Sequence, residues 1–509
     1  MGRGLLDVDP RLVVFGAAVA AAALRFPGLF YPLGADEAGF TTVARHWEPR
    51  PESVYGPYFL DRPPILVGLV KVSDFIGGPY FLRVVAAAGC VLLVVAAAAT
   101  GREALRFAGV TDIRLISRTG AWTAVLTAAF TANAMIDPVM AKGEVLGIPL
   151  VVASFWLGLR ALGRERVDRV SLGLAATAGT SAALALGLKQ NMAAGLLFGA
   201  ILLLGARVER RITTPELVRL GAAALFGALV PVLATVGWAE SADVRLEVLW
   251  HAIYGFRIDA LSVVTGGSAN GPAERGLLLL GIGVATGMAF VLAGVVFHAR
   301  RLSHFSATLL VATLSVVVLD LGGLWLGGSL WRQYLFVLIP GLTLCAILLL
   351  AVRVEVARRA RALVVLAAAT SVVSSVLWAS LYTAGVAPAF ETHSGSAIAA
   401  AAAPGDTIVV YGGRADLVLA SGLESPYPYL WSLPMRTLDP ELEGLRGLLA
   451  GPDAPTWVVM MAPGYSWDRL GESIRPVLDA RYAVHGRVCR GRYVYLLNDV
   501  DRPPLAPAC

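Results

Sequence analysis

Long apolar runs alternate with short polar connections along most of the chain. A helix needs about 20 mainly apolar residues to cross the hydrocarbon core of a membrane, and about eleven segments approach that length. The pattern therefore predicts a mainly α fold, a polytopic bundle of membrane-spanning helices. The predicted spans are 12–31, 83–100, 120–136, 145–159, 171–188, 192–206, 217–238, 276–297, 305–321, 334–351 and 363–382.

Arginines occur in alternate connections between these spans. Because arginine-rich connections stay in the cytoplasm, and because an even number of crossings separates the clusters, we expect the amino terminus inside the cell. An odd number of spans then places the carboxyl-terminal tail outside. The first apolar run also fits a cleaved signal peptide, whose removal leaves the external placement of the remainder unchanged. The clusters are Arg3 and Arg11; Arg102, Arg106, Arg114 and Arg118; Arg160, Arg164, Arg166 and Arg169; Arg207, Arg210, Arg211 and Arg219; Arg300 and Arg301; and Arg353, Arg358, Arg359 and Arg361.

Residues 32–82 form a connection that is too long and too polar for a simple turn. Its amphipathic pieces, around Glu37–Trp47 and Ile65–Ile76, predict two short helices at the outer membrane surface. Residues 1–382 thus form the predicted membrane domain, and this external loop belongs to it.

The tail, residues 383–509, differs in charge density and periodicity. Apolar stretches at Thr407–Gly412, Thr456–Met461 and Arg492–Leu497 predict buried strands, and helical stretches at Asp416–Ser421 and Trp467–Leu478 follow the first two. This order predicts a small external α/β domain. Several tail residues either stack on sugars or complete a core and a tight turn: Tyr411, Gly412, Gly413, Tyr427, Tyr429 and Trp431.

Composition narrows the class of protein. Of the 509 residues, 57% are hydrophobic and 15% charged, against about 25% charged in soluble proteins, which excludes a water-soluble enzyme. The formal charge of +6 does not indicate a nucleic-acid partner, because the arginines lie between apolar runs and form no basic face. Cys90 and Cys345 lie in apolar runs, whereas Cys489 and Cys509 can pair if the tail faces an oxidising compartment.

Two clusters of charged residues lie on the predicted external loop. Asp36 and Glu37 follow the first span, and Asp61 and Arg62 precede two prolines that begin another helix. Each has a plain structural interpretation: Asp36 caps a helix, and Asp61 forms a local ion pair with Arg62. Together they also fit a chemical site, because a carboxylate can take a proton from a hydroxyl and an arginine can bind a phosphate through paired hydrogen bonds.

Further polar residues are predicted on the same side of the membrane. Plain alternatives exist for each: a solvated turn, an ordinary hydrogen-bonding histidine or an interfacial aromatic belt. A helical spacing would place His251 and Tyr254 on one side with Arg257 or Gly255, and His251 is also a candidate metal ligand. The candidates are Asp137, Glu144 with Lys142, Lys189, His251 with Tyr254 and Arg257, and Arg332 with Tyr334.

The ordered motifs resemble the GT-C glycosyltransferases, and most closely the branch that holds the lipid A aminoarabinose transferases and the protein O-mannosyltransferases. Two positions depart from that branch, where lysine is commoner than Arg62 and aspartate is usual in place of Glu144. The likeness covers most of the membrane portion and does not extend to a role for the tail. It runs through Asp36-Glu37-Ala38, Asp61-Arg62-Pro63-Pro64, Glu144, Gly187-Leu188-Lys189-Gln190, Arg257, and Arg332-Gln333-Tyr334 with Pro340.

The resemblance implies transfer of a sugar from a polyprenyl-phosphate donor to a hydroxyl of a cell-envelope glycan, lipid or protein, at the outer face of the plasma membrane. It implies Asp36 as general base with Glu37 as the second choice. Phosphate binding falls to Arg62, Arg257, Lys189, Arg332 and Tyr334, and contacts with sugar or acceptor fall to Asp61, Glu144 and His251. No nucleotide is needed, because the leaving group is already a phosphate. Whether Asp61 and Glu144 bind a divalent cation or orient sugar or acceptor stays open.

Two other functions remain in view. A transporter or lipid flippase with an external accessory domain would carry ionisable residues at mid-membrane and weak inverted repeats. Asp320 and Lys71 lie near apolar stretches but close to predicted outer ends, and no repeat is evident. A catalytically silent scaffold whose tail binds wall polymer is the third possibility. The absence of a Walker A loop, of H-E-x-x-H and of C-x-x-C weighs against nucleotide-driven transport, zinc proteolysis and thiol redox chemistry.

Overall fold

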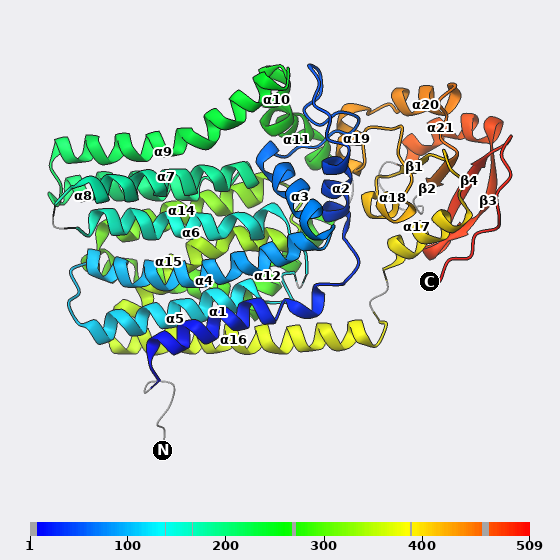
Figure 1. Ribbon diagram of the computed structural model, residues 1–509. Coiled ribbons are helices and arrows are strands. Elements are labelled where there is room, and N and C mark those ends of the chain that lie inside the picture. The colour runs from blue at the N-terminus through cyan, green and yellow to red at the C-terminus, as the bar shows by residue number, and fades with distance from the viewer. Residues whose placement is uncertain (1–7, 138, 165, 267–270, 387–388, 461–467) are drawn as a thin grey trace. The chain divides into compact units, whose positions relative to one another are not determined.

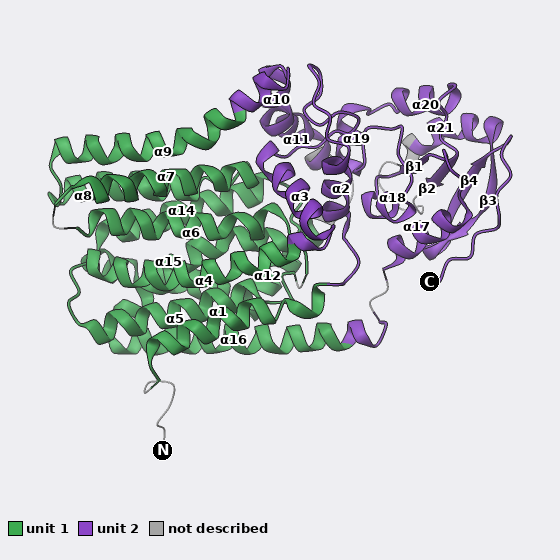
Figure 2. Cartoon of the chain, in the orientation of Figure 1, with its two compact units in different colours: residues 1–29, 83–235, 272–380 green, residues 30–82, 236–271, 381–509 purple. Residues whose placement is uncertain are grey.

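The computed structural model describes residues 8–137, 139–164, 166–266, 271–386, 389–460 and 468–509. The chain divides into two compact units (Figure 2). The bundle unit comprises residues 1–29, 83–235 and 272–380, and the second unit comprises residues 30–82, 236–271 and 381–509. The second unit thus groups the tail with the loop that follows the first span and with residues 236–271. Each unit is described by itself.

The bundle unit consists of long helices that run side by side (Figure 1). They are α1 (Pro10–Ala23), α4 (Phe81–Phe107), α5 (Ile113–Thr131), α6 (Gly143–Leu162), α7 (Arg169–Leu188), α8 (Ala194–Val208), α9 (Thr214–Ser241), α12 (Gly271–Ala285), α13 (Met288–Phe305), α14 (Ala307–Leu326), η4 (Arg332–Leu338) with α15 (Ile339–Ala351), and α16 (Val354–Thr383), of which α4, α9, α12 and α16 extend past the limits of the unit. Ten of the eleven predicted spans each coincide with one helical segment, and the span 276–297 covers two helices, α12 and α13.

Among the described residues, eight helices are long and apolar enough to cross a membrane, or nine if α12 and α13 form one span. These two helices are bent by 75° where one straight span was predicted. The bend lies at Gly287, whose positive φ of 88° is a conformation that glycine adopts without a steric penalty. Helix α8 has only 15 residues, and α5 carries two arginines and several hydroxyl side chains, so both fall outside the count.

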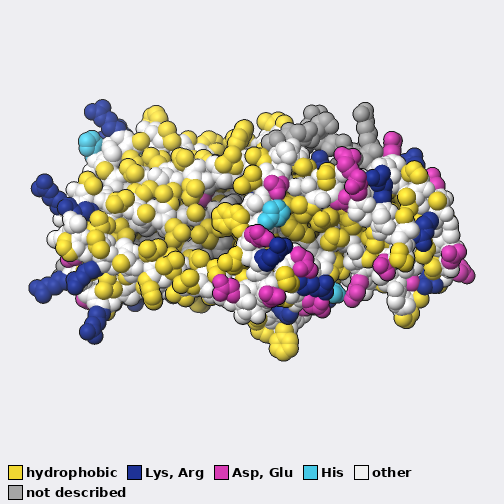
Figure 3. Space-filling model, turned by 90° about the horizontal axis from the view of Figure 1, so that it is seen from above, with side chains coloured by type: hydrophobic (Ala, Val, Ile, Leu, Met, Phe, Trp, Pro, Cys, Tyr) yellow, Lys and Arg dark blue, Asp and Glu magenta, His cyan; other side chains and the backbone are white. Residues whose placement is uncertain are grey.

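Burial divides these helices into a central helix and lipid-facing helices. The span that includes α15 is 89% buried inside the protein, whereas the spans of α9 and α16 are 22% buried and expose valine and leucine side chains. Figure 3 shows a hydrophobic face of the bundle with basic side chains gathered at one end. The chain is therefore a multi-pass membrane protein, whose outward-facing apolar surface is solvated by lipid.

The two predicted surface helices are present in the second unit as α2 (Ala35–Arg45) and α3 (Pro64–Gly77). Arg45 holds them together, because its guanidinium donates two hydrogen bonds to the Asp74 carboxylate at 2.8 and 2.9 Å. The unit also contains α10 (Leu246–Trp250), the π-helix η3 (His251–Gly255) and α11 (Phe256–Gly266).

The tail contains the predicted α/β fold. Its sheet has the order β1-β2-β4-β3, in which β1 and β2 are parallel and the other two pairings are antiparallel. The three predicted strands are confirmed, and β3 is an addition that its polar, bulged sequence concealed. The elements are α17 (Phe390–Ala401), β1 (Ile408–Tyr411), α18 (Ala415–Ser421), α19 (Ser432–Leu438), α20 (Glu443–Ala450), β2 (Trp457–Met460), α21 (Asp468–Arg481), β3 (Tyr482–Val488), η5 (Cys489–Gly491) and β4 (Arg492–Leu497).

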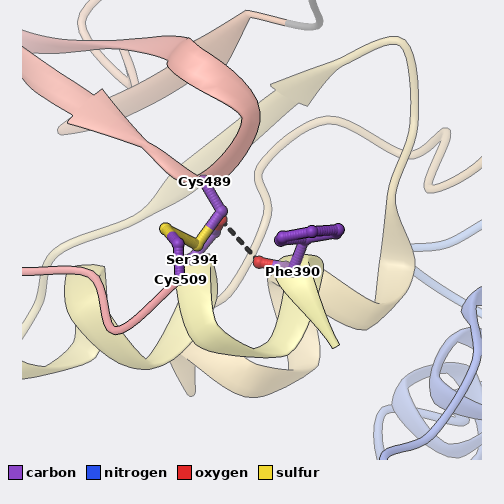
Figure 4. The surroundings of a disulfide bond; sticks show 4 residues. All are labelled: Phe390, Ser394, Cys489 and Cys509. Atoms are coloured by element: carbon purple, nitrogen blue, oxygen red, sulfur yellow. Dashed lines mark hydrogen bonds between the residues drawn. A yellow bond between two sulfur atoms is a disulfide. The ribbon is translucent and has the colours of Figure 1, made fainter. Parts of the chain in front are cut away.

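A disulfide and two buried ion pairs fix the edges of the tail. Cys489 and Cys509 are bonded beside the first turn of α17 (Figure 4). Arg492 on β4 is 3% exposed and pairs with Glu391 at 2.7 Å. Arg502 donates to Asp406, which also accepts a hydrogen bond from the Trp457 indole at 2.9 Å. The carboxyl-terminal residues are thus bonded back to the sheet.

Candidate active site

The first turn of α2 carries the two adjacent carboxylates. The cap is Gly34, and the Glu37 carboxylate accepts a hydrogen bond from the Gly34 N–H at 3.4 Å. Glu37 is 2% exposed. The sequence alternative that made Asp36 the cap is therefore wrong, because the helix begins at Ala35 and Asp36 is already its second residue. The Glu37 carboxylate thus takes part in capping α2, and the Asp36 carboxylate does not.

Asp36 is half-buried and contacts a residue of the tail. Its Oδ1 atom accepts a hydrogen bond from the indole N–H of Trp431 at 3.2 Å. Phe40, one turn further along α2, packs on the same indole with ring centroids 6.1 Å apart. Because residues four apart lie on one helical face, Asp36, Phe40 and the docked indole share a face of α2.

Asp61 lies between two arginines and forms what we call the arginine cluster: Asp61, Arg62 and Arg257. Arg62 contacts one carboxylate oxygen at 2.7 Å, and Arg257 forms an ion pair with the other. The side chains of Asp61 and Arg62 are 11% and 15% exposed. The cluster carries one positive charge in excess, so it suits an anion better than it suits a cation.

The backbone around Arg62 is fixed from two sides. Pro63 and Pro64 set the backbone at the start of α3. The hydroxyl of Tyr55 donates to the carbonyl of Arg62. Burial, with a smaller contribution from Asp61, raises the pKa of Tyr55 well above its ordinary value, so the phenol remains a donor. Arg62 is therefore held in place by its neighbours.

Arg62 also faces the side of α2 that carries Asp36. Its guanidinium carbon lies 6.0 Å from the centroid of the Phe40 ring, within the range of a cation–π contact. Phe40, which shares a face of α2 with Asp36, thus also contacts Arg62.

Arg257, which pairs with Asp61, follows a π-helical turn. The predicted α-helical spacing grouped His251, Tyr254 and Arg257, but η3 spans His251–Gly255 and separates them. His251 pairs with Asp259 at 3.0 Å, and both side chains are about half exposed. Tyr254 packs on Trp250 with ring centroids 4.7 Å apart. A π-turn of this kind often marks a functional position.

A second charged group, the lysine cluster, lies in the bundle unit: Glu144, Lys189 and Tyr334. Lys189 forms an ion pair with Glu144, and its Nζ atom lies 4.5 Å from the centroid of the Tyr334 ring. Both charged side chains are at most 10% exposed. The start of α6 packs closely on the end of α7, since a Cβ at Gly143 would lie 2.6 Å from the Leu188 carbonyl oxygen. Arg332 is exposed at the start of η4.

Other candidates from the sequence have structural contacts. The Oδ1 atom of Asp137 accepts hydrogen bonds from the backbone N–H groups of Val139 and Met140, both at 3.0 Å, which fits the plain turn interpretation. The search for metal ligands, made over the described part of the chain, finds no group of three or more His, Cys, Asp or Glu side chains. Asp61 and Glu144, which were expected either to orient sugar or to bind a cation, are both paired with basic side chains.

Two cavities in the bundle unit lie by the arginine-rich connections. An apolar cavity of about 450 Å³ lies between α1, α5 and α16 and includes Arg118, and a polar cavity of about 530 Å³ includes Arg106, Arg160, Arg164 and Arg166. The clusters Arg102–Arg106 and Arg160–Arg166 therefore lie together, as their alternate placement predicted. Neither cavity contains a residue predicted for the site.

Sequence reasoning missed the partners of the site more than its principal residues. Trp431 was considered for sugar stacking and not as a donor to Asp36, because nothing in the sequence joins positions 36 and 431. Arg25 was also missed: it is 6% exposed and donates to the carbonyls of Thr131, Val139 and Met140 at the end of α5. An arginine inside an apolar run was the available signal.

The fold is that of a multi-pass membrane protein with a small α/β tail. No family model matches the chain, and no curated protein matches its sequence. Solved structures do share its fold. The crystal structure of ArnT from Cupriavidus metallidurans bound to undecaprenyl phosphate matches with a TM-score of 0.59 and 14% identity, over 95% of this chain and 97% of that chain.

Two structures of an archaeal enzyme are also similar. The Archaeoglobus fulgidus oligosaccharyltransferase tethered to an acceptor peptide matches with a TM-score of 0.53 and 13% identity, over 98% of this chain and 76% of that chain. AglB from the same organism, in complex with an inhibitory peptide and a dolichol-phosphate, matches with a TM-score of 0.51 and 13% identity, over 97% and 75%. The resemblance that the motifs indicated is thus confirmed for the fold.

Proposed function

We propose that this protein is a membrane glycosyltransferase, which moves a sugar from a polyprenyl-phosphate donor to a hydroxyl of a cell-envelope glycan, lipid or protein. The observation that carries the proposal is the arrangement of Asp36 and Arg62 about one face of α2. A base and a cation set apart in this way suit a reaction in which a hydroxyl attacks and a phosphate leaves. The fold neighbours that hold undecaprenyl phosphate and dolichol-phosphate support the class of donor.

The proposed reaction is a single displacement. The acceptor oxygen bonds to the anomeric carbon, the bond from that carbon to the phosphate oxygen breaks, and the acceptor proton passes to Asp36. The polyprenyl phosphate leaves with the bonding electrons, and Arg62 and Arg257 stabilise its charge through guanidinium hydrogen bonds. One displacement inverts the anomeric configuration. Glu37 is the weaker candidate for the base, because its carboxylate is buried and caps α2.

The remaining sequence candidates are proposed with smaller roles. We assign Lys189, Arg332 and Tyr334 to the donor phosphate, and Glu144 and His251 to the sugar or the acceptor. The ion pair with Glu144 already neutralises Lys189, so this lysine is the weakest of the phosphate candidates. Asp61 acts through the two arginines that it positions.

We place the reaction on the outer face of the plasma membrane, with the amino terminus in the cytoplasm and the tail outside. Two observations support this orientation. The arginine-rich connections lie together by the cavities of the bundle unit, as the positive-inside rule requires of cytoplasmic loops. The disulfide between Cys489 and Cys509 suits an oxidising compartment.

The test is transfer by the purified full chain. The protein, in lipid nanodiscs, is incubated with a panel of polyprenyl-phosphate sugars and a total-envelope acceptor fraction, and released polyprenyl phosphate is measured with and without EDTA. We expect release with at least one donor and an inverted product. If release occurs without EDTA and stops when EDTA is added, the site requires a divalent cation. No release from any donor, with folded protein, would contradict the proposal.

A second candidate, ion-coupled transport, rests on Asp320. This residue of α14 is 2% exposed, and its Oδ2 atom has no hydrogen-bond partner among the described residues. Ionisable residues inside a span often mark an ion pathway. If the protein is a transporter, Asp320→Asn would abolish a proton-dependent flux in proteoliposomes. If it is a glycosyltransferase, the same variant would leave sugar transfer unchanged.

A further inference from the structure

Trp431 ties the tail to the first turn of α2. It immediately precedes α19, and its indole N–H donates to Asp36 at 3.2 Å. Its ring also packs on Phe40 with an interplanar angle of 43°. The tail, whose role the sequence resemblance leaves open, thus contacts the carboxylate proposed as the base.

Two glycines make room for this tryptophan. A Cβ at Gly39 would lie 2.1 Å from Cζ2 of the indole, and a Cβ at Gly413 would lie 2.4 Å from the Trp431 backbone. Gly413 also has a φ of +67°. Glycine inside a helix is less favourable than alanine by about 0.5–1 kcal/mol, so Gly39 gives up helix stability where the indole approaches.

Further hydrogen bonds hold the segment that leads to Trp431. The backbone N–H of Phe59 donates to the carbonyl of Pro428 at 3.0 Å, and the backbone N–H of Ser425 donates to the hydroxyl of Tyr58 at 3.2 Å. Residues 425–431 therefore follow the loop between α2 and α3, and the indole contact is the end of a longer interface.

We propose that Trp431 is a positioning residue: its N–H fixes the rotamer of the Asp36 carboxylate for proton transfer, so the tail is part of the catalytic unit. This inference rests on the proposed glycosyltransferase function. Loss of the indole N–H lowers the population of the carboxylate rotamer that suits proton transfer. It should therefore slow the chemical step more than it weakens binding of the donor substrate.

Trp431→Phe tests the hydrogen bond, because it keeps an aromatic side chain at position 431 and removes the N–H. We expect kcat to fall about 10-fold, the effect of one hydrogen bond to a charged group, with the KM for the polyprenyl-phosphate donor unchanged within about twofold. An unchanged kcat would overturn the proposal. If the KM for the acceptor rises at the same time, the result would indicate that Trp431 stacks on a sugar instead.

Trp457→Phe is the matched control. The Trp457 indole also donates to an aspartate, Asp406, at 2.9 Å, but inside the fully buried core of the tail. This variant should lower the unfolding temperature and leave kcat per folded molecule unchanged. If it lowers kcat as much as Trp431→Phe does, loosening of the tail explains both results and the positioning role is wrong.

Gly39→Ala tests the fit from the side of α2. The added methyl group favours the helix but displaces the indole, so we expect kcat to fall about 10-fold or more. In a Trp431→Ala background the same change should alter kcat less than about twofold, because the obstacle is gone. Gly68→Ala in α3 is the control, since its Cβ would lie 3.8 Å from the nearest Trp47 atom, an ordinary contact. A full kcat in Gly39→Ala would contradict the proposal.

Hydrogen exchange separates failure of this inference from failure of the function. Trp431→Ala should speed exchange of the α2 amides whether or not the chain transfers sugar. If the wild type transfers no sugar, the proposed function fails and the positioning role falls with it, even where exchange confirms the docking. If the wild type transfers sugar and exchange in Trp431→Ala is unchanged, the function stands and the inference is overturned.

Discussion

The arginine cluster and the lysine cluster differ in the kind of cation that contacts the carboxylate. Asp61 forms ion pairs with two guanidinium groups, those of Arg62 and Arg257, whereas Glu144 forms an ion pair with the ammonium group of Lys189 and also interacts electrostatically with Lys142. Guanidinium groups bind phosphate oxygens in pairs, which an ammonium cannot do. The difference teaches that the chemistry of the cation, more than burial, separates a candidate phosphate site from an internal ion pair.

The largest effect should follow from removal of the shared carboxylates. Asp61→Asn leaves two partly buried arginines facing each other, and Glu144→Gln leaves the buried Lys142 and Lys189 without this carboxylate. Each variant should destabilise the fold, by up to about 3–5 kcal/mol. Thermal unfolding of the purified chain measures this. Lys189→Met in the Glu144→Gln background should recover much of the loss. If that double variant stays as unstable as Glu144→Gln, the lysine cluster is not a simple ion pair.

The next effect sharpens the comparison through donor binding. Arg62→Ala should raise the KM for a polyprenyl-phosphate donor about 10- to 100-fold, because a hydrogen bond to a charged group contributes about 1.5–3 kcal/mol. Lys189→Met should raise it less than about fivefold, since the ammonium group of Lys189 is engaged by Glu144 and lacks the paired donors of a guanidinium. Steady-state kinetics of both variants decide the matter. Equal effects would show that the kind of cation does not separate the two clusters.

The smallest effect concerns a third shared carboxylate, in the tail. Glu391 pairs with Arg414 at 3.1 Å and with Arg492 at 2.7 Å. Burial, the largest single cause, would raise the pKa of Glu391, but the two arginines outweigh it and hold that pKa below its ordinary value. The ion pairs therefore stabilise the folded tail above about pH 4.5, and this contribution is lost as the pH falls below that value.

Hydrogen exchange of the β1 and β4 amides, corrected for intrinsic rates, checks this dependence in the full chain. Protection should decline from pH 5 towards pH 3.5, and Glu391→Gln should flatten the decline. A wild-type tail that keeps full protection at pH 3.5 would show that sharing between two arginines does not suffice to make a carboxylate sensitive to acid.

The sequence predicted elements whose pattern is local. The length of the apolar runs predicted a helix at every span, and short apolar stretches in the tail predicted β1, β2 and β4. It did not predict the break at Gly287, because a bend between two apolar helices leaves hydropathy unchanged. It also missed β3, whose polar residues and bulge lack the apolar run of a buried strand.

The candidate site shows the same limit. Asp61 with Arg62 was readable because the pair is adjacent and followed by prolines. The contact from Arg257 to Asp61 joins residues almost 200 positions apart, and the contact from Trp431 to Asp36 joins the tail to the first loop. Such long-range contacts follow from tertiary packing, and no spacing in one sequence encodes them.

Asp36 is the residue on which the account depends most directly. Its central test is the single-turnover release of polyprenyl phosphate by Asp36→Asn. The control is Glu247→Gln, because Glu247 is an exposed carboxylate of the same unit that pairs with Arg245. We predict that Asp36→Asn loses release by at least about 100-fold, the contribution of a general base, while it still binds the lipid donor, and that Glu247→Gln matches the wild type. Release by Asp36→Asn at the wild-type rate would contradict the account.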